Sequence, residues 1–328
     1  MTIKEQLAEL LVENRGKFIS GEELAKRLYC TRSAVWKAVA ALRKDGFNIS
    51  AVTNRGYCLD DCDKISEAEI RRLTAAERIV VLKTTNSTNA YLREMARLGA
   101  PHGTLVVSSE QTNGSGRLGR SFFSPADTGI YMSILLRPDF PVQEAVKITS
   151  AAAVAVCLAI EEVCGASPEI KWVNDIYISG KKVAGILTEA SADIENGAFE
   201  YAVLGIGINV YPPENGFPKE IADIAGAVLE NRADNARNRL AAAVYTHFMK
   251  LYKKLPESVY LEEYRKRLMW KNERIYVLSG ANGEVRTPAV LLEADENCAL
   301  RVRYADGSEG TVFSGEICIR ACSGSEEK

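Results

Sequence analysis

Histidine is scarce in this chain of 328 residues, which contains only His102 and His247. A hydrolase with a Ser-His-Asp triad is therefore not expected, because its general base is a histidine. The eight cysteines include no C-x-x-C pair. Without that spacing, and with so few histidines to complete a ligand set, we expect neither a zinc site nor a disulfide framework.

The chain also lacks a long hydrophobic run and a strong net charge. Its longest apolar run, ITSAAAVAVCLAI at 148–160, is too short to span a bilayer, and residues 1–11 do not read as a signal peptide. We therefore expect a cytoplasmic protein. The formal net charge is −2, but residues 1–60 hold ten Lys/Arg against seven Asp/Glu. Any nucleic acid is expected to bind at this N-terminal end.

Residues 1–63 are predicted to form a winged helix-turn-helix domain. Three helical periods follow one another closely, and Ser20 and Thr31 are suitable N-caps for the second and third helices. Two short strands are expected to follow, on either side of the turn TNRG at 53–56. A hairpin in this place is the wing of a winged helix.

Four exposed polar residues of this domain are candidates for DNA contact. Arg32, Ser33 and Lys37, on or near the third helix, suit phosphate or base-edge contacts in a major groove. Arg55, at the tip of the wing, suits the DNA backbone or the minor groove. The alternative is a winged helix that contacts proteins instead of DNA.

The rest of the chain divides into two regions and a tail. Residues 64–270 mix strands, such as 79–83, 104–109, 131–136 and 201–210, with helices at 88–97, 143–164 and 237–255, which predicts an α+β or α/β sheet domain. Residues 271–322 contain short strands separated by turn signals, a pattern typical of a small β-barrel. The polar tail 323–328 is expected to be disordered.

The most informative stretch is EQTNGSGRLGR at 110–120, whose glycines and arginines are typical of an anion-binding loop. Gly114, Gly116 and Gly119 match the G-x-G-x-x-G dinucleotide motif, and the stretch also approximates a P-loop. Both motifs require a helix after the loop, whereas GIYMSILL at 129–136 predicts a strand. We therefore predict a loop between two strands. Unless other polar motifs accompany it, a plain turn is the alternative.

Other polar segments do accompany it. Ser87, Thr88 and Asn89 follow a predicted strand, and capping of the next helix explains only one of them. The segment KWVND at 171–175 and the lysines at 181–182 flank a Ser-Gly turn, so a hairpin should bring Lys171 and Lys182 together. The glycines of GIGIN at 205–209 admit a close ligand. Together these segments predict a neutral hydrogen-bonding pocket beside a cationic one, suited to a small carboxylate that meets a nucleotide phosphate.

These motifs, in this order and spacing, resemble the biotin protein ligase family. With the N-terminal winged helix, the chain looks like the bifunctional members that also repress the biotin operon. The resemblance implies a central mixed α/β catalytic domain of the biotin/lipoate ligase type and a C-terminal SH3-like barrel. It also implies a two-step reaction. Biotin and ATP form biotinyl-5′-AMP and pyrophosphate, and the biotinyl group then passes to a lysine of the biotin carboxyl carrier protein of acetyl-CoA carboxylase.

The resemblance implies roles for individual residues as well. Lys182 and Arg117 would be catalytic, facing the carboxylate and the α-phosphate. Biotin would be bound by Ser87, Thr88, Asn89, Gln111, Ser115, Gly116, Arg117 and Lys182. ATP and the adenylate would be bound by Gly114, Arg120, Lys171, Asn174 and Asn209. Magnesium is implied with ATP, without an assigned protein ligand. Operator DNA and, once the adenylate is bound, a second copy of the chain are the other implied partners.

Two positions depart from the family pattern. Ser115 replaces an arginine of GRGRxGR, and Val173 replaces the proline of KWPND. The missing guanidinium bears on retention of the intermediate more than on its synthesis. Two alternatives remain open: a biotin-sensing regulator with weak ligase activity, which Ser115 favours, and a ligase for another carboxylate such as lipoate. The polar residues 87–89 and Gln111 favour biotin over lipoate.

Overall fold

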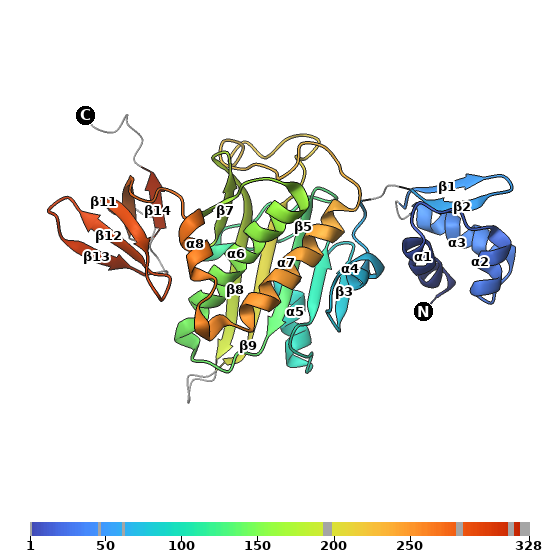
Figure 1. Ribbon diagram of the computed structural model, residues 1–328, viewed down its shortest axis with the longest axis horizontal. Helices are drawn as coiled ribbons and strands as arrows, with labels where there is room; N and C mark the ends of the chain where they lie inside the picture. The colour runs from blue at the N-terminus through green and yellow to red at the C-terminus, as the bar shows by residue number, and fades with distance from the viewer. Residues whose placement is uncertain are drawn as a thin grey trace.

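The computed structural model describes residues 2–44, 47–60, 63–192, 199–279, 285–313 and 318–321. These residues form three sheets that follow one another along the long axis of the molecule (Figure 1). The winged helix lies at one end, a seven-stranded sheet in the middle and a five-stranded sheet at the other end. The predicted disordered tail, residues 323–328, lies outside the described residues.

The N-terminal region is a helix-turn-helix with a wing, as predicted. It comprises helices α1 (Ile3–Glu13), α2 (Gly21–Arg27) and α3 (Arg32–Lys44) and the hairpin of β1 (Ile49–Val52) and β2 (Gly56–Leu59). Ser20 Oγ accepts a hydrogen bond from Glu23 N at 3.1 Å, and Thr31 Oγ1 accepts one from Ala34 N at 3.2 Å. Both predicted N-caps are therefore present, and the apolar faces of the helices form one buried cluster.

The central sheet has the strand order β3-β4-β5-β9-β8-β7-β6. Its strands are β3 (Ile79–Leu82), β4 (Leu105–Ser108), β5 (Gly129–Leu136), β6 (Glu169–Lys171), β7 (Asp175–Ile178), β8 (Lys181–Ala192) and β9 (Phe199–Asn209). The pair β3–β4 is parallel and the other pairs are antiparallel. Loop 110–120 connects β4 to β5, so the prediction of a loop between two strands is confirmed.

Helices cover both faces of this sheet (Figure 1). They are α4 (Glu67–Leu73), α5 (Thr88–Arg97), α6 (Ala145–Cys164), α7 (Ala236–Tyr252) and α8 (Leu261–Arg267). Val106 of β4 packs in the apolar cluster under α5, whereas its neighbours Leu105 and Val107 belong to the cluster under α6 and α7. This alternation is the pleat of a strand that is buried on both faces.

Helix α6 begins two residues later than predicted, after a 3₁₀ turn at Val142–Glu144, and strand β6 and helix α8 were not predicted. The alanine-rich run of α6 lies in the main core of the central domain. In the part of the chain that the structure describes, no helix is both long and apolar enough to cross a membrane.

The C-terminal strands form an antiparallel sheet in the order β13-β12-β11-β10-β14. They are β10 (Arg274–Ser279), β11 (Val285–Ala294), β12 (Leu300–Tyr304), β13 (Glu309–Val312) and β14 (Cys318–Ala321). Among the described residues the pairing runs from β13 to β14 without closing, so the SH3-like barrel stays a prediction. Trp172 Nε1 donates to Cys298 O at 2.8 Å, which fastens this region to the central domain. The peptide bond between Trp172 and Val173 is cis.

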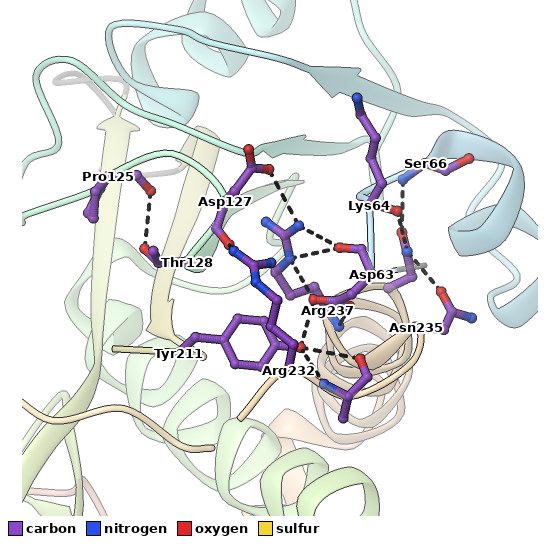
Figure 2. Close-up of polar contacts among 12 residues, drawn as sticks. Asp63, Lys64, Ser66, Pro125, Asp127, Thr128, Tyr211, Arg232, Asn235 and Arg237 are labelled. Carbon is purple, nitrogen blue, oxygen red and sulfur yellow. Dashed lines mark hydrogen bonds and ion pairs between the residues drawn. The ribbon is translucent and has the colours of Figure 1, made fainter. Parts of the chain in front are cut away.

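A buried polar cluster holds the segment after the wing against the central domain (Figure 2). Arg237 of α7 donates from Nε to Asp63 Oδ2 at 2.9 Å, and its backbone N donates to Asp63 Oδ1 at 2.7 Å. The Tyr211 hydroxyl donates to Asp63 Oδ2 at 2.7 Å. Arg237 Nη2 also lies 3.5 Å from Asp127 Oδ1, on the segment that leads into β5. Asp63 is thus bound by two parts of the central domain, α7 through Arg237 and the segment after β9 through Tyr211.

The winged helix makes a second polar contact with the central domain through Arg15, just after α1. Arg15 Nη1 lies 2.8 Å from Asp234 Oδ1, and Arg15 Nε lies 3.5 Å from Glu69 Oε1 of α4. The Glu69 side chain is buried, with 2% exposure. This contact and Asp63 together position the winged helix at the end of the molecule near α4.

Candidate functional site

A cavity of about 180 Å³ opens on the central sheet beside loop 110–120. All but two of the residues predicted to bind biotin or ATP line it, namely Ser87, Thr88, Asn89, Gln111, Ser115, Gly116, Arg117, Arg120, Lys171, Asn174 and Lys182. These residues come from segments that lie up to 95 positions apart in the sequence. The structure therefore brings the separate motifs to one place.

Gly114 and Asn209 are the two predicted residues that do not line this cavity. Gly114 is buried, and a Cβ there would lie 2.4 Å from Phe122 O, so the glycine permits the loop to fold closely on itself. Asn209 Nδ2 donates to Gly226 O at 3.0 Å. Asn209 thus fastens the end of β9 to the loop that follows it.

The loop over the cavity is a small hairpin with its own hydrogen bonds. Gly116 N donates to Arg120 O at 2.7 Å, and Phe122 N donates to Gly114 O at 2.8 Å. Its tip is Leu118, which has a positive φ of 56° and is 55% exposed. Backbone hydrogen bonds therefore define how the loop presents Arg117 and Arg120 to the cavity.

Cationic side chains occupy one part of the cavity wall. The turn at Ser179 and Gly180 joins β7 to β8, with φ of 50° and 75°, so Lys182 returns beside the KWVND segment as predicted. Lys182 Nζ lies 2.6 Å from Asp175 Oδ1. Arg117 Nη1 donates to Asn174 Oδ1 at 3.1 Å. These contacts hold the Lys182 and Arg117 side chains in defined positions at the cavity.

Lys171 lies at the end of β6, between two aromatic rings. Its Nζ is 5.4 Å from the centre of the Trp270 ring and 5.7 Å from that of Tyr177. Burial raises the pKa of Tyr177 to about 12, so its ring remains neutral at physiological pH. The aromatic faces attract the ammonium group and orient it while leaving its positive charge in place.

Glycines allow side chains to lie directly on the strands that form the floor. A Cβ at Gly207 would lie 2.5 Å from Phe122 Cε1, and a Cβ at Gly205 would lie 2.3 Å from Asn89 Oδ1. The close ligand that the glycines of GIGIN were predicted to admit stays a prediction. In this structure the approaching groups are Phe122 and Asn89.

The neutral end of the cavity is a connected set of hydrogen bonds. Gln111 Oε1 accepts from Thr88 N at 2.8 Å, and Gln111 Nε2 donates to Ser124 Oγ at 3.1 Å. Ser133 Oγ lies 2.8 Å from Thr88 Oγ1 and 2.6 Å from Asn89 Oδ1. The side chains that face the cavity are therefore oriented by partners behind them.

Three residues that orient these side chains were not among the predicted site residues: Ser124, Ser133 and Glu189. Ser133 has a signal, because it is the one polar side chain in the apolar strand GIYMSILL and is fully buried. Glu189 accepts from Asn89 Nδ2 at 2.7 Å and also pairs with Arg93. Glu189 ends the sequence KKVAGILTE in β8, and no pattern in the sequence marks it as a partner of Asn89.

The predicted DNA-contact residues all lie at the surface of the winged helix. Arg32, Ser33 and Lys37 are exposed on α3, which contains no acidic residue. Arg55 is exposed on the wing, with its guanidinium 4.2 Å from the centre of the Phe18 ring. Trp36, which sequence reasoning did not single out, shares the exposed face of α3 and is 62% exposed.

Comparison with known proteins gives consistent matches for both regions. The biotin/lipoate A/B protein ligase family matches residues 81–209, and the HTH domain family matches residues 4–58. The chain is 38% identical to the bifunctional ligase/repressor BirA of Bacillus subtilis (strain 168) over 292 residues, which cover 87% of this chain and 88% of that protein. The corresponding protein of Escherichia coli (strain K12) is 27% identical, over 90% of this chain and 93% of its own length.

A solved structure is similar as well. It is the biotin protein ligase from Aquifex aeolicus in complex with biotin and ATP, with a TM-score of 0.62 and 26% identity over 75% of this chain and 100% of that one. Together with the two family matches, it confirms the predicted fold class: an N-terminal helix-turn-helix followed by a mixed sheet of the ligase type.

Proposed function

The chain belongs to the biotin/lipoate A/B protein ligase family, and on that premise we propose that it is a cytoplasmic biotin protein ligase that also represses transcription. In the first reaction a carboxylate oxygen of biotin attacks the α-phosphorus of ATP, and pyrophosphate leaves. In the second, a lysine amine of a biotin carboxyl carrier protein attacks the acyl carbon of biotinyl-5′-AMP, and AMP leaves.

The observation that carries this proposal is the arrangement of charge in the cavity. Four cationic side chains, those of Arg117, Arg120, Lys171 and Lys182, line the cavity together with neutral hydrogen-bonding groups. A carboxylate is already a nucleophile at neutral pH, so the first reaction needs no general base. The main barrier is repulsion between two anions, which fixed cations in a partly enclosed site reduce.

Individual side chains have distinct proposed roles. Lys182, held by Asp175 at 2.6 Å, and Arg117, held by Asn174 at 3.1 Å, would face the carboxylate and the α-phosphate. Lys171 and Arg120 would neutralise the other phosphates. Ser87, Thr88, Asn89 and Gln111 would face the ureido group of biotin. The loop residues Ser115 and Gly116 would cover the ligand.

Magnesium would enter as part of the ATP–magnesium substrate. Within the described residues, Asp175 is the only carboxylate that lines the cavity, and it pairs with Lys182. Nor do those residues contain a group of three or more His, Cys, Asp or Glu side chains that could hold a metal ion. This supports a metal bound chiefly by phosphate oxygens and water, the usual environment of magnesium with nucleotides.

Repression would use the exposed face of α3 and the wing. Arg32, Ser33, Lys37 and Arg55 supply positive and polar groups there, which suit operator DNA. The proposed active form on DNA is a homodimer that carries the adenylate.

Incubation of the protein with biotin, radiolabelled ATP and magnesium tests the enzymatic proposal. We expect labelled biotinyl-5′-AMP without a carrier, and a biotinylated lysine with release of AMP when a carrier domain is added. Lipoate in place of biotin should give no adenylate. If an adenylate forms from lipoate but not from biotin, the protein is a lipoate ligase. If biotin binds but no adenylate forms, the protein is a regulator without ligase activity.

A further inference from the structure

A continuous line of hydrogen bonds runs behind the neutral end of the cavity. It begins at Glu189 of β8, which lies 2.7 Å from Asn89 Nδ2. It continues from Asn89 Oδ1 to Ser133 Oγ at 2.6 Å and from Ser133 Oγ to Thr88 Oγ1 at 2.8 Å. Thr88 and Asn89 line the cavity, whereas Ser133 is fully buried. Glu189 is therefore connected to Thr88 through three hydrogen bonds.

The chemistry of the Glu189 end determines the direction of every bond in this line. A carboxylate only accepts hydrogen bonds, so the amide nitrogen of Asn89 must face Glu189 and its oxygen must face Ser133. An amide oxygen carries no proton, so the single Ser133 proton must go to Asn89. The Ser133 oxygen is then available to accept the proton of the Thr88 hydroxyl.

The direction of these bonds decides what Thr88 offers to the cavity. Once its proton points to Ser133, Thr88 Oγ1 presents lone pairs and acts as an acceptor. Gln111 Oε1 lies 3.1 Å from Thr88 Oγ1 and would otherwise compete for that proton, but it also receives the Thr88 backbone N–H at 2.8 Å. Gln111 therefore remains hydrogen-bonded to Thr88 in either arrangement.

We propose that Glu189 is a positioning residue that sets the direction of this hydrogen-bond line and thereby makes Thr88 an acceptor for a ureido N–H of the ligand. The inference rests on the proposed function, because biotin is the ligand that supplies the ureido group. A ureido group has two N–H donors and one carbonyl acceptor. A fixed acceptor in the cavity therefore binds its N–H side and not its carbonyl oxygen.

Arg93 of α5 would determine how the amide of a glutamine at position 189 is oriented. It pairs with the second oxygen of the Glu189 carboxylate, and a guanidinium only donates. In Glu189→Gln the single amide oxygen would turn to Arg93 and the amide nitrogen would face Asn89. Asn89 would then flip, its nitrogen would donate to Ser133, and Ser133 would donate to Thr88. Thr88 would lose acceptor capacity on the cavity side.

The test compares Glu189→Gln, Arg93→Met and the double variant in the biotin-dependent pyrophosphate release assay. Loss of one neutral hydrogen bond predicts an increase of about tenfold in the KM for biotin of Glu189→Gln. The kcat and the KM for ATP should not change, because the cationic part of the cavity is untouched. Arg93→Met keeps the acceptor-only carboxylate and should retain the wild-type KM for biotin.

The double variant distinguishes an effect on the direction of the hydrogen bonds from a general disturbance of packing around position 189. Without the arginine, the introduced glutamine can offer its oxygen to Asn89, so the KM for biotin should return to within about threefold of wild type. An unchanged KM in Glu189→Gln, or a double variant as impaired as the single one, would overturn the inference. Failure of the wild-type protein to form biotinyl-5′-AMP would instead overturn the proposed function, so the two failures are distinguishable.

Discussion

Arg237 of α7 and Asp63, just after the wing domain, form an ion pair with 2.9 Å between Nε and Oδ2 and with side chains only 2% and 6% exposed (Figure 2). The hydroxyl of Tyr211 also donates to Asp63. Charges so far from water are tolerated when their partners are in place, and removal of one partner is costly. Asp63 is the last residue of the predicted DNA-binding domain, yet its contacts belong to the central domain.

Replacing Asp63 with alanine should destabilise the protein by about 3–5 kcal/mol, because it leaves the guanidinium of Arg237 buried without its carboxylate. Urea unfolding measures the change. The control is Glu67→Ala, which removes an exposed pair with Arg71 whose side chains are 49% and 46% exposed. That pair should contribute about 0.5 kcal/mol or less. Equal effects of the two substitutions would contradict a structural role for the buried pair.

Two truncations that differ by one residue distinguish the role of the winged helix in DNA binding from the role of Asp63 in stability. Removing residues 1–62 or 1–63 should abolish binding to DNA from upstream of the biotin genes, because both remove α3 and the wing. Biotin ligation should largely survive in both. The protein that retains Asp63 should unfold at a higher urea concentration. DNA binding by either truncated protein would be evidence against the winged helix as the DNA-binding element.

Lys182→Ala should reduce the rate of biotinyl-5′-AMP formation by roughly a hundredfold or more, the scale of losing one group that stabilises a transition state. The neighbouring Lys181→Ala is the matched control. Lys181 Nζ donates to Asp223 O at 2.6 Å, and its side chain does not line the cavity. Pyrophosphate release by Lys181→Ala should stay near wild type. Near-normal release by Lys182→Ala would refute the assignment of Lys182.

Ser115→Arg should slow dissociation of biotinyl-5′-AMP. Ser115 lines the cavity, so an arginine at this position would place a guanidinium where the adenylate is proposed to bind. Recovery of about 1.4 kcal/mol from a charge-assisted hydrogen bond would slow release about tenfold. Stopped-flow dissociation measures it. The control, Thr112→Arg, adds the same charge to the same loop outside the cavity and should not change the dissociation rate. Equal rates for the wild-type protein and both variants would show that Ser115 does not limit retention of biotinyl-5′-AMP.

Features that arise from short-range interactions could be predicted from the order of the residues. The caps Ser20 and Thr31, the apolar periods of the helices and the Ser-Gly turn that returns Lys182 to the KWVND segment all depend on neighbours a few positions away. Such interactions leave a local pattern that can be recognised. The motif set also indicates the family, because its residues recur in a fixed order and spacing along the chain.

The tertiary structure alone decided which polar groups support the site. Asp63 and Arg237 are 174 positions apart, and Asn89 and Glu189 are 100 positions apart. No local periodicity links such pairs, because their contact depends on how strands and helices pack. Asn89, predicted to bind biotin directly, has its amide engaged by Ser133 and Glu189 for the same reason. A buried polar group must find its partner wherever the fold supplies one, and that place is set by the packing of the whole domain.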